Sequence, residues 1–242
     1  MRPAHTLLIG ALALFGPGAH ACPVAEAIRP WPTPGSSSTE APRAPLPASR
    51  SAPQAASSSD YRERLNPTPA GWARLDHWCV WVEPTGATGP QNPWEQRWLG
   101  AVEAALKRWQ REVSIERVDD PSRAQVRVRR QRPPLRQENG RLRASHGRAL
   151  LELVQVQRQG QWRLEPHVEV LISPGQRPLG IEATSLHELG HAFGLWGHSD
   201  QPTDAMAAVP GPVPLLELSE RDRATLRWLY GQPALDAPRG AR

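Results

Sequence analysis

The 242-residue chain is poor in cysteine and lysine, and it lacks long apolar segments. Its two cysteines exclude both a disulfide framework and a zinc site built from cysteine ligands. Beyond the N-terminus no apolar run reaches the roughly 18 residues of a membrane-spanning helix, which excludes a multi-pass membrane protein. The net charge of +5 is spread along the chain without a basic stripe, so we expect no nucleic-acid partner.

The first 21 residues have the order of a secretory signal peptide. Arg2 precedes an apolar run at residues 6–15, and small residues follow up to Ala21. We expect cleavage after Ala21 and a secreted or periplasmic protein with no stable membrane span. Cleavage there makes Cys22 the first residue, so an envelope lipoprotein with a lipid anchor on Cys22 is the alternative. Lipoprotein signals, however, prefer a larger aliphatic residue than Ala19 at that place.

The composition divides the rest of the chain into three parts. Residues 22–70 are rich in proline, alanine and serine, and their few apolar side chains cannot offset the entropy of ordering, which predicts a disordered linker. Residues 71–234 have the pattern of one globular domain, expected to be monomeric, and residues 235–242 are expected to form a disordered tail. Cys79 is expected to be a small buried side chain, with a bridge to Cys22 as the lesser option.

Short β-type runs and helical patterns predict an α/β domain with a twisted mixed sheet of four to five strands. The strands are expected at residues 77–82, 113–118, 124–128, 149–156 and 167–172. Residues 93–112 place apolar side chains three or four positions apart, which predicts a long amphipathic helix near the N-terminal end of the domain. Its tryptophan stripe is expected to pack in the core. Residues 131–147 are expected to form a long exposed connection.

The most informative segment is a second helix, expected to begin near Gly180, that carries His187-Glu188-Leu189-Gly190-His191. Histidines four positions apart lie one turn apart on one face of an α-helix, so both imidazoles can reach one metal ion. Glu188 projects beside that ion, where it can accept a proton from a metal-bound water. The segment therefore predicts a metal site with an adjacent general base.

Two histidines make an incomplete site, because catalytic zinc takes three protein ligands and keeps one position open for water. Gly194 stands where a helix can end in the left-handed conformation that favours glycine. A sharp turn there brings His198 back beneath the first two histidines, so we expect His198 as the third ligand. Asp200 and Asp204 are the alternatives for this place.

The stretch from His187 to Ser199 resembles the zinc signature of the metzincin metallopeptidases, in particular the matrixin-like bacterial branch. Residues 203–206 are similar to the Met-turn of that group. Residues 218–230 are similar to its C-terminal helix, for which Ser219 is a suitable N-cap. The resemblance implies an α+β zincin-type fold with an active-site helix, a Met-turn that packs Met206 beneath the metal, and a Zn²⁺ cofactor.

The resemblance implies a secreted zinc-dependent endopeptidase that hydrolyses protein or peptide substrates. Zinc held by His187, His191 and His198 would activate a water, and Glu188 would take the water proton and pass it to the leaving amine. One feature departs from the usual matrixin pattern, since three residues rather than two separate Gly194 from the third histidine. Because some bacterial matrixin-like sequences have this longer spacing, we still expect His198 to be the third ligand.

The same analogy suggests where a substrate would bind. An edge strand within residues 149–154 would pair with extended substrate backbone. Residues 207–214 would wall the pocket that receives the side chain after the cleaved bond. His146 and His167 are expected to be ordinary surface or strand histidines, because neither has the acidic surroundings of the additional metal sites of animal matrixins.

Two other classes of function stay open on the sequence. A secreted zincin-fold module could hold zinc without turnover, tethered at the cell envelope through Cys22 and the linker, although Glu188 would then be superfluous. A structural envelope protein could use its tryptophans and arginines to bind a polymer. Such a protein would not depend on zinc, so a chelator separates it from the other two.

Overall fold

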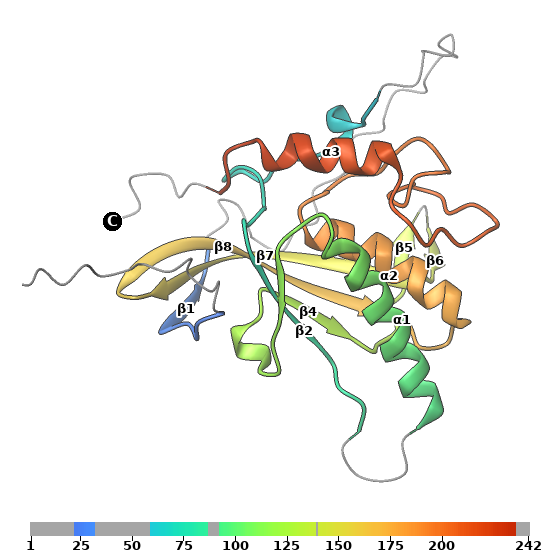
Figure 1. The fold of residues 1–242 in the computed structure, drawn as a ribbon, viewed down its shortest axis with the longest axis horizontal. Helices are drawn as coiled ribbons and strands as arrows, with labels where there is room; N and C mark the ends of the chain where they lie inside the picture. The colour runs from blue at the N-terminus through green and yellow to red at the C-terminus, as the bar shows by residue number, and fades with distance from the viewer. Residues whose placement is uncertain (1–21, 32–58, 87–91, 139, 236–242) are drawn as a thin grey trace, which may run out of the picture.

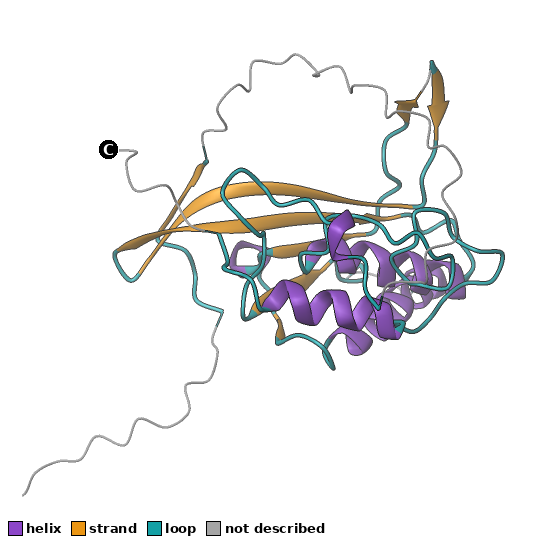
Figure 2. Cartoon of the chain, turned by 90° about the horizontal axis from the view of Figure 1, so that it is seen from above, coloured by secondary structure: helices purple, strands orange, loops and turns teal. Residues whose placement is uncertain are grey.

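The computed structural model describes residues 22–31, 59–86, 92–138 and 140–235. The predicted signal peptide at 1–21 and all but the first residue of the predicted C-terminal tail lie outside these residues. Within the described part, three helices cover one face of a mixed β-sheet (Figures 1 and 2). The predicted α/β class is therefore confirmed at this level.

The main sheet has six strands in the order β1-β7-β8-β4-β2-β3. They are β1 (Ala27–Pro30), β2 (Trp78–Val82), β3 (Ile115–Arg117), β4 (Val126–Arg129), β7 (Gly147–Arg158) and β8 (Gln161–Ile172). Strands β2, β3, β4 and β8 are parallel, β7 is antiparallel to β8, and β1 is antiparallel to β7. A separate hairpin, β5 (Arg136–Glu138) and β6 (Arg141–Arg143), stands off the main sheet (Figure 2).

The helices are α1 (Pro93–Trp109), α2 (Pro178–Ala192) and α3 (Glu220–Tyr230). Trp98 and Trp109 of α1 are fully buried, and their indole N–H groups donate to the carbonyl oxygens of Ile172 and Leu186. These bonds satisfy the polar edges of both rings and fix α1 against the sheet and α2. Trp94, by contrast, is 68% exposed and does not belong to the core. No described helix combines the length and the apolarity needed to cross a membrane.

Several predictions about the elements need correction. The main sheet has six strands instead of four to five, because β1 joins its edge. The helix expected at residues 93–112 is α1, but β1 and β2 precede it along the chain, so the long N-terminal helix of the predicted fold class is not seen. The hairpin β5–β6 lies within residues 131–147, where only a connection was expected.

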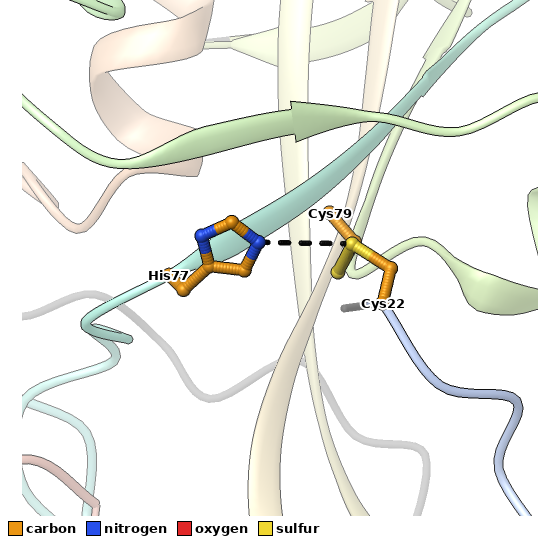
Figure 3. A group of neighbouring side chains, drawn as sticks. All are labelled: Cys22, His77 and Cys79. Atoms are coloured by element: carbon orange, nitrogen blue, oxygen red, sulfur yellow. Dashed lines mark hydrogen bonds between the residues drawn. A yellow bond between two sulfur atoms is a disulfide. The ribbon is translucent and has the colours of Figure 1, made fainter. Parts of the chain in front are cut away.

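Both described ends of the predicted linker belong to the fold. Cys22 and Cys79 form a disulfide with a Cα–Cα distance of 5.8 Å (Figure 3), so Cys79 is buried as expected, but in the bridge to Cys22 that was the lesser option. This bond closes a loop that spans 57 positions, which stabilises the folded chain by about 4 kcal/mol in the chain-entropy estimate. At the other end Tyr61 is fully buried and donates to Asp222 of α3 at 2.8 Å. Residues 32–58 lie outside the described part.

Candidate metal centre and active site

Helix α2 carries His187 and His191 and ends just beyond them. Gly194 has a φ of +108°, the left-handed conformation that the sequence predicted, and an added Cβ would lie 3.1 Å from the carbonyl oxygen of Ala73. The chain reverses at this glycine and returns His198 to the helix. Ligand atoms of His187, His191 and His198 lie within 4.8 Å of one another, so the structure brings the three predicted ligands together.

The three imidazoles suit a zinc ion in spacing and in protonation. Tetrahedral zinc with bonds of about 2.0–2.1 Å holds its nitrogens roughly 3.4 Å apart, so small side-chain shifts would complete the site. Nδ1 of His187 lies 2.8 Å from the carbonyl oxygen of Ala205, and Nδ1 of His191 lies 2.7 Å from that of Leu195. Because a carbonyl oxygen only accepts, each Nδ1 must donate, which leaves Nε2 of both rings with a lone pair for a metal.

The electrostatics of the site favour neutral imidazoles and an unusual carboxyl group. Burial lowers the pKa of His187 to about 4 and that of His191 to about 3, and partial desolvation also lowers the pKa of His198. Neutral imidazole is the form that binds a metal. Burial raises the pKa of Glu188 to about 7, against the opposing effect of a hydrogen bond from the backbone of Ala149. Such a carboxyl group can exchange protons near neutral pH.

The two aspartates considered as alternative third ligands make other contacts. The carboxylate of Asp204 accepts from Oγ of Ser199 at 2.5 Å and from the guanidinium of Arg221 at 2.7 Å. Asp200 accepts from the same guanidinium at 3.1 Å. Neither aspartate belongs to the histidine group, and the loop with its extra residue still delivers His198 to it.

Met206 lies against the middle of α2. Its side chain is fully buried, and a Cβ added at Gly190, between the two helical histidines, would overlap the Met206 sulfur. The backbone N–H of Ala205, whose carbonyl oxygen orients His187, donates to Asp222 at 2.8 Å. Asp222 also accepts from the backbone of Ser219 in the capping box that begins α3. The sequence predicted the cap, but not that Asp222 ties it to the turn beneath the histidines.

Glu188 is packed against the first residues of β7. A Cβ added at Gly147 would lie 2.5–2.7 Å from Cγ2 of Thr184 and from Cγ and Oε1 of Glu188. Only glycine therefore allows the strand to approach the helix this closely. Sequence reasoning missed Gly147 as a site residue, because the only available signal was a single glycine at the boundary between the expected connection and the next strand.

A cavity of about 410 Å³ opens beside His187 and Glu188. One wall is the segment after Met206, as the sequence analogy proposed. The wider lining comprises Ala144, Ser145, His146, Gly147, Ala183, Thr184, Asp204, Ala205, Ala207, Ala208, Pro210, Gly211, Val213, Pro214 and Leu215. His146, expected to be an ordinary surface histidine, thus lies at the cavity.

The outer edge of β7 borders the site but is shorter than predicted. An open edge was expected within residues 149–154, yet β1 pairs with β7 from Val154 to Gln157. The backbone N–H of Trp31 also donates to the carbonyl oxygen of Leu153 at 3.1 Å. Among the described residues, the edge is left for another strand only over residues 147–152.

Two further described histidines, His77 and His167, lie outside this cluster. His77 forms a group with Cys22 and Cys79, and its Nε2 lies 3.8 Å from Sγ of Cys22 (Figure 3). The two sulfurs are joined to each other, so they are not available as thiolate ligands. His167 lies on β8 outside both groups of potential ligands, and burial lowers its pKa to about 4. The described residues therefore contain one histidine cluster with the chemistry of a catalytic metal site.

No protein-family model matches the chain, and no curated protein matches it. The functional assignment therefore depends on the arrangement of the side chains and on the sequence motif that they carry.

Proposed function

We propose that this protein is a secreted zinc-dependent endopeptidase of the matrixin-like metzincin type. The observation that carries the proposal is the convergence of His187, His191 and His198 on one point, with Glu188 beside them and the 410 Å³ cavity alongside. Three neutral imidazoles and an adjacent carboxyl group are the protein groups that a hydrolytic zinc site requires. The position of Met206 beneath the helix fits the Met-turn of that family.

In this proposal the peptide bond lies between the histidine cluster and the first residues of β7. When bound, zinc supplies Lewis-acid polarisation of the scissile carbonyl and lowers the pKa of a water at the site. The Glu188 carboxylate accepts a proton from the attacking water and delivers it to the amine that leaves. Its raised pKa suits both transfers, because the group is neither too weak a base nor too weak an acid at neutral pH.

The substrate backbone is held by strand addition to the open edge of β7. Main-chain groups on that edge accept and donate hydrogen bonds whatever the substrate sequence, and the cavity then selects one side chain. Most of the cavity lining is alanine, proline, valine and leucine. An apolar side chain next to the scissile bond is therefore the preferred occupant.

The disulfide supports the secreted location that the sequence suggested, because such bonds persist in oxidising compartments. It also bears on the lipoprotein alternative. A lipid thioether and a disulfide cannot share the sulfur of Cys22, so the folded form described here is the unlipidated one. The intact mass of the mature chain distinguishes the two forms.

The test is zinc content and hydrolysis of a quenched-fluorescence peptide library by the mature chain and two matched variants. Glu188→Gln removes the general base without changing side-chain size, and we expect kcat to fall by about a thousandfold with one zinc still bound. Glu182→Gln makes the same change on the same helix, at the residue paired with Arg108, and should keep full activity. Chelation should abolish cleavage, and added zinc should restore it.

Other outcomes would reject the proposal. Stoichiometric zinc with no cleavage of any library member would favour a binding module. Cleavage that survives both the chelator and Glu188→Gln would exclude the proposed mechanism. Absence of zinc after loading would exclude the metal site itself.

A further inference from the structure

Strand β1 occupies the same edge of β7 that the proposed substrate would use. It pairs antiparallel with β7 in continuous register, from Ala27 opposite Gln157 to Pro30 opposite Val154. The pairing ends where the backbone N–H of Trp31 donates to Leu153. Because β7 begins beside Glu188 and runs away from it, β1 runs toward the catalytic end of the edge and stops short of it (Figure 1).

The segment that contains β1 is held in place at its start by more than strand pairing. Cys22 is bonded to Cys79 of β2, and its carbonyl oxygen accepts from Arg123 at 2.6 Å. The carbonyl oxygen of Pro23 accepts from Arg158 at the far end of β7. Arg29 donates to the Gln155 side chain at 2.6 Å. Glu26 also accepts from the backbone N–H of Gly160, and the Arg29 guanidinium lies over the Trp162 ring. The disulfide is the one covalent link in this set, and without it only noncovalent contacts and four residues of strand pairing would hold the segment.

The register shows how much edge remains for a substrate. Ala149 donates toward Glu188, and Leu153 accepts from Trp31, so Leu151, midway between them, directs its backbone groups to the same outer edge. From Ala149 to Leu153 the edge measures about 13 Å, which is room for about four substrate residues at ~3.3 Å each. A substrate collinear with β1 has the polarity of β1, so these are the residues N-terminal to the scissile bond.

We propose that β1, clamped by the Cys22–Cys79 disulfide, closes the N-terminal end of the substrate edge at Leu153 and so limits the number of substrate residues that pair with β7. Reduction of the disulfide releases β1 and lengthens the edge. The inference rests on the proposed peptidase function and adds to it a length specificity that depends on the redox state of two cysteines far from the metal ligands.

The experiment compares one cleavable core peptide carrying two, four, six or eight residues before the scissile bond. For the oxidised, zinc-loaded mature chain we expect kcat/KM to rise up to about four residues and then to level off. For the double variant Cys22→Ser with Cys79→Ser, kcat/KM should continue to rise, by about tenfold between four and eight residues, because two or more further backbone hydrogen bonds become available. The two-residue peptide should be cleaved equally by both proteins.

Chemical reduction removes the Cys22–Cys79 disulfide from the wild-type protein without any substitution. A phosphine reductant cleaves the sulfur–sulfur bond, and the phosphine becomes phosphine oxide with oxygen from water while Cys22 and Cys79 become thiols. The reduced wild-type chain should acquire the length dependence of the double variant. The double variant itself should not respond to the phosphine.

A second variant keeps the disulfide and therefore guards against misfolding. Trp31→Pro removes the N–H that donates to Leu153, together with the indole side chain, and so frees that carbonyl oxygen. We expect an equal gain of a few-fold for the six- and eight-residue peptides and none for the shorter ones. Val24→Pro makes the same kind of change at a residue that is 61% exposed and precedes β1, and it should behave as wild type.

The outcomes separate this inference from the proposed function. If the wild type cleaves the short peptide and all proteins share one length dependence, the proposed limit that β1 sets on substrate length is rejected, and the proposed peptidase function is retained. A rise in kcat/KM for every peptide, including the shortest, would indicate that the variants are more flexible throughout, and it would also reject the limit that β1 sets on substrate length. No cleavage by any protein would reject both.

Discussion

Substitution of Gly147 by alanine should separate catalysis from metal binding. The added Cβ would lie 2.5–2.7 Å from Thr184 and Glu188, about 1 Å closer than the roughly 3.5 Å of ordinary carbon contacts. The neighbours are Cγ and Oε1 of Glu188 and the Cγ2 methyl group of Thr184. Glu188 is buried and the Thr184 hydroxyl is bonded to Gln176, so either β7 must move from α2 or the Glu188 carboxylate must move from its place beside the histidines.

The size of the effect follows from that displacement. A misplacement of about 1 Å in a catalytic group costs roughly a hundredfold in rate, which corresponds to about 2.7 kcal/mol of transition-state stabilisation. We therefore expect Gly147→Ala to lower kcat/KM about a hundredfold. Zinc content should stay at the wild-type value, because none of the three histidines is among the nearest neighbours of the added atom. The overpacking should lower the free energy of unfolding by about 1–3 kcal/mol.

The assay is peptide hydrolysis with zinc content and urea unfolding measured on the same preparations. Gly100→Ala is the matched control, because an added Cβ in that part of α1 has no atom within 4 Å and alanine favours a helix. The control should retain full activity. Activity of Gly147→Ala within about threefold of wild type, with the fold intact, would refute the role given to this approach. Loss of zinc together with activity would show that the damage reaches the ligands.

Three further predictions concern the ligand set, acid stability and the support of the turn. His198→Ala should weaken zinc binding by at least about a hundredfold in a competition titration, whereas Asp204→Asn should not; equal losses would contradict the ligand assignment. Burial holds the pKa of His167 near 4 in the folded chain, against about 6.5 unfolded, so protonation favours unfolding and stability should fall by about 3 kcal/mol from pH 6.5 to pH 4. In urea unfolding of the zinc-loaded protein, His167→Gln should lack that part of the fall, and parallel pH profiles would refute it. Asp222→Ala should lower the free energy of unfolding by about 3–5 kcal/mol, because several donors lose a buried carboxylate, and a loss under 1 kcal/mol would refute its role.

The histidine cluster could be predicted from sequence because its geometry is local. His187 and His191 are held at the right spacing by the helix that contains them, and the glycine at 194 fixes the reversal that returns His198. All of this depends on backbone rules that act over a few residues. The neighbouring strands could also be predicted from the sequence, since the alternation of their apolar residues matches the faces that the structure buries. The burial of Cys79 was also predicted, although its bond to Cys22 was only the lesser option.

The N-terminal segment was misjudged for the opposite reason. Residues 22–31 have a composition that cannot form a core on its own, and β1 is only four residues long. Its stability comes from partners that lie much later in the sequence, namely Cys79 and residues 154–157 of β7. No local pattern reports such pairing, because strand addition uses backbone groups that every residue carries.

The proposed activity likewise has one part that could be predicted from the sequence and one part that could not. The groups that would perform the chemistry lie within one helix and the loop after it, so a motif identifies them. The shape of the cleft depends instead on approaches between distant segments: Gly147 of β7 against Glu188, Asp222 of α3 beneath the turn, and Trp31 against Leu153. Each of these approaches depends on the absence of a side chain or on a single hydrogen bond from a backbone N–H, and neither leaves a periodic signal. If the proposed function holds, substrate length and the accuracy of catalysis should therefore respond to substitutions that leave the three histidines and Glu188 untouched.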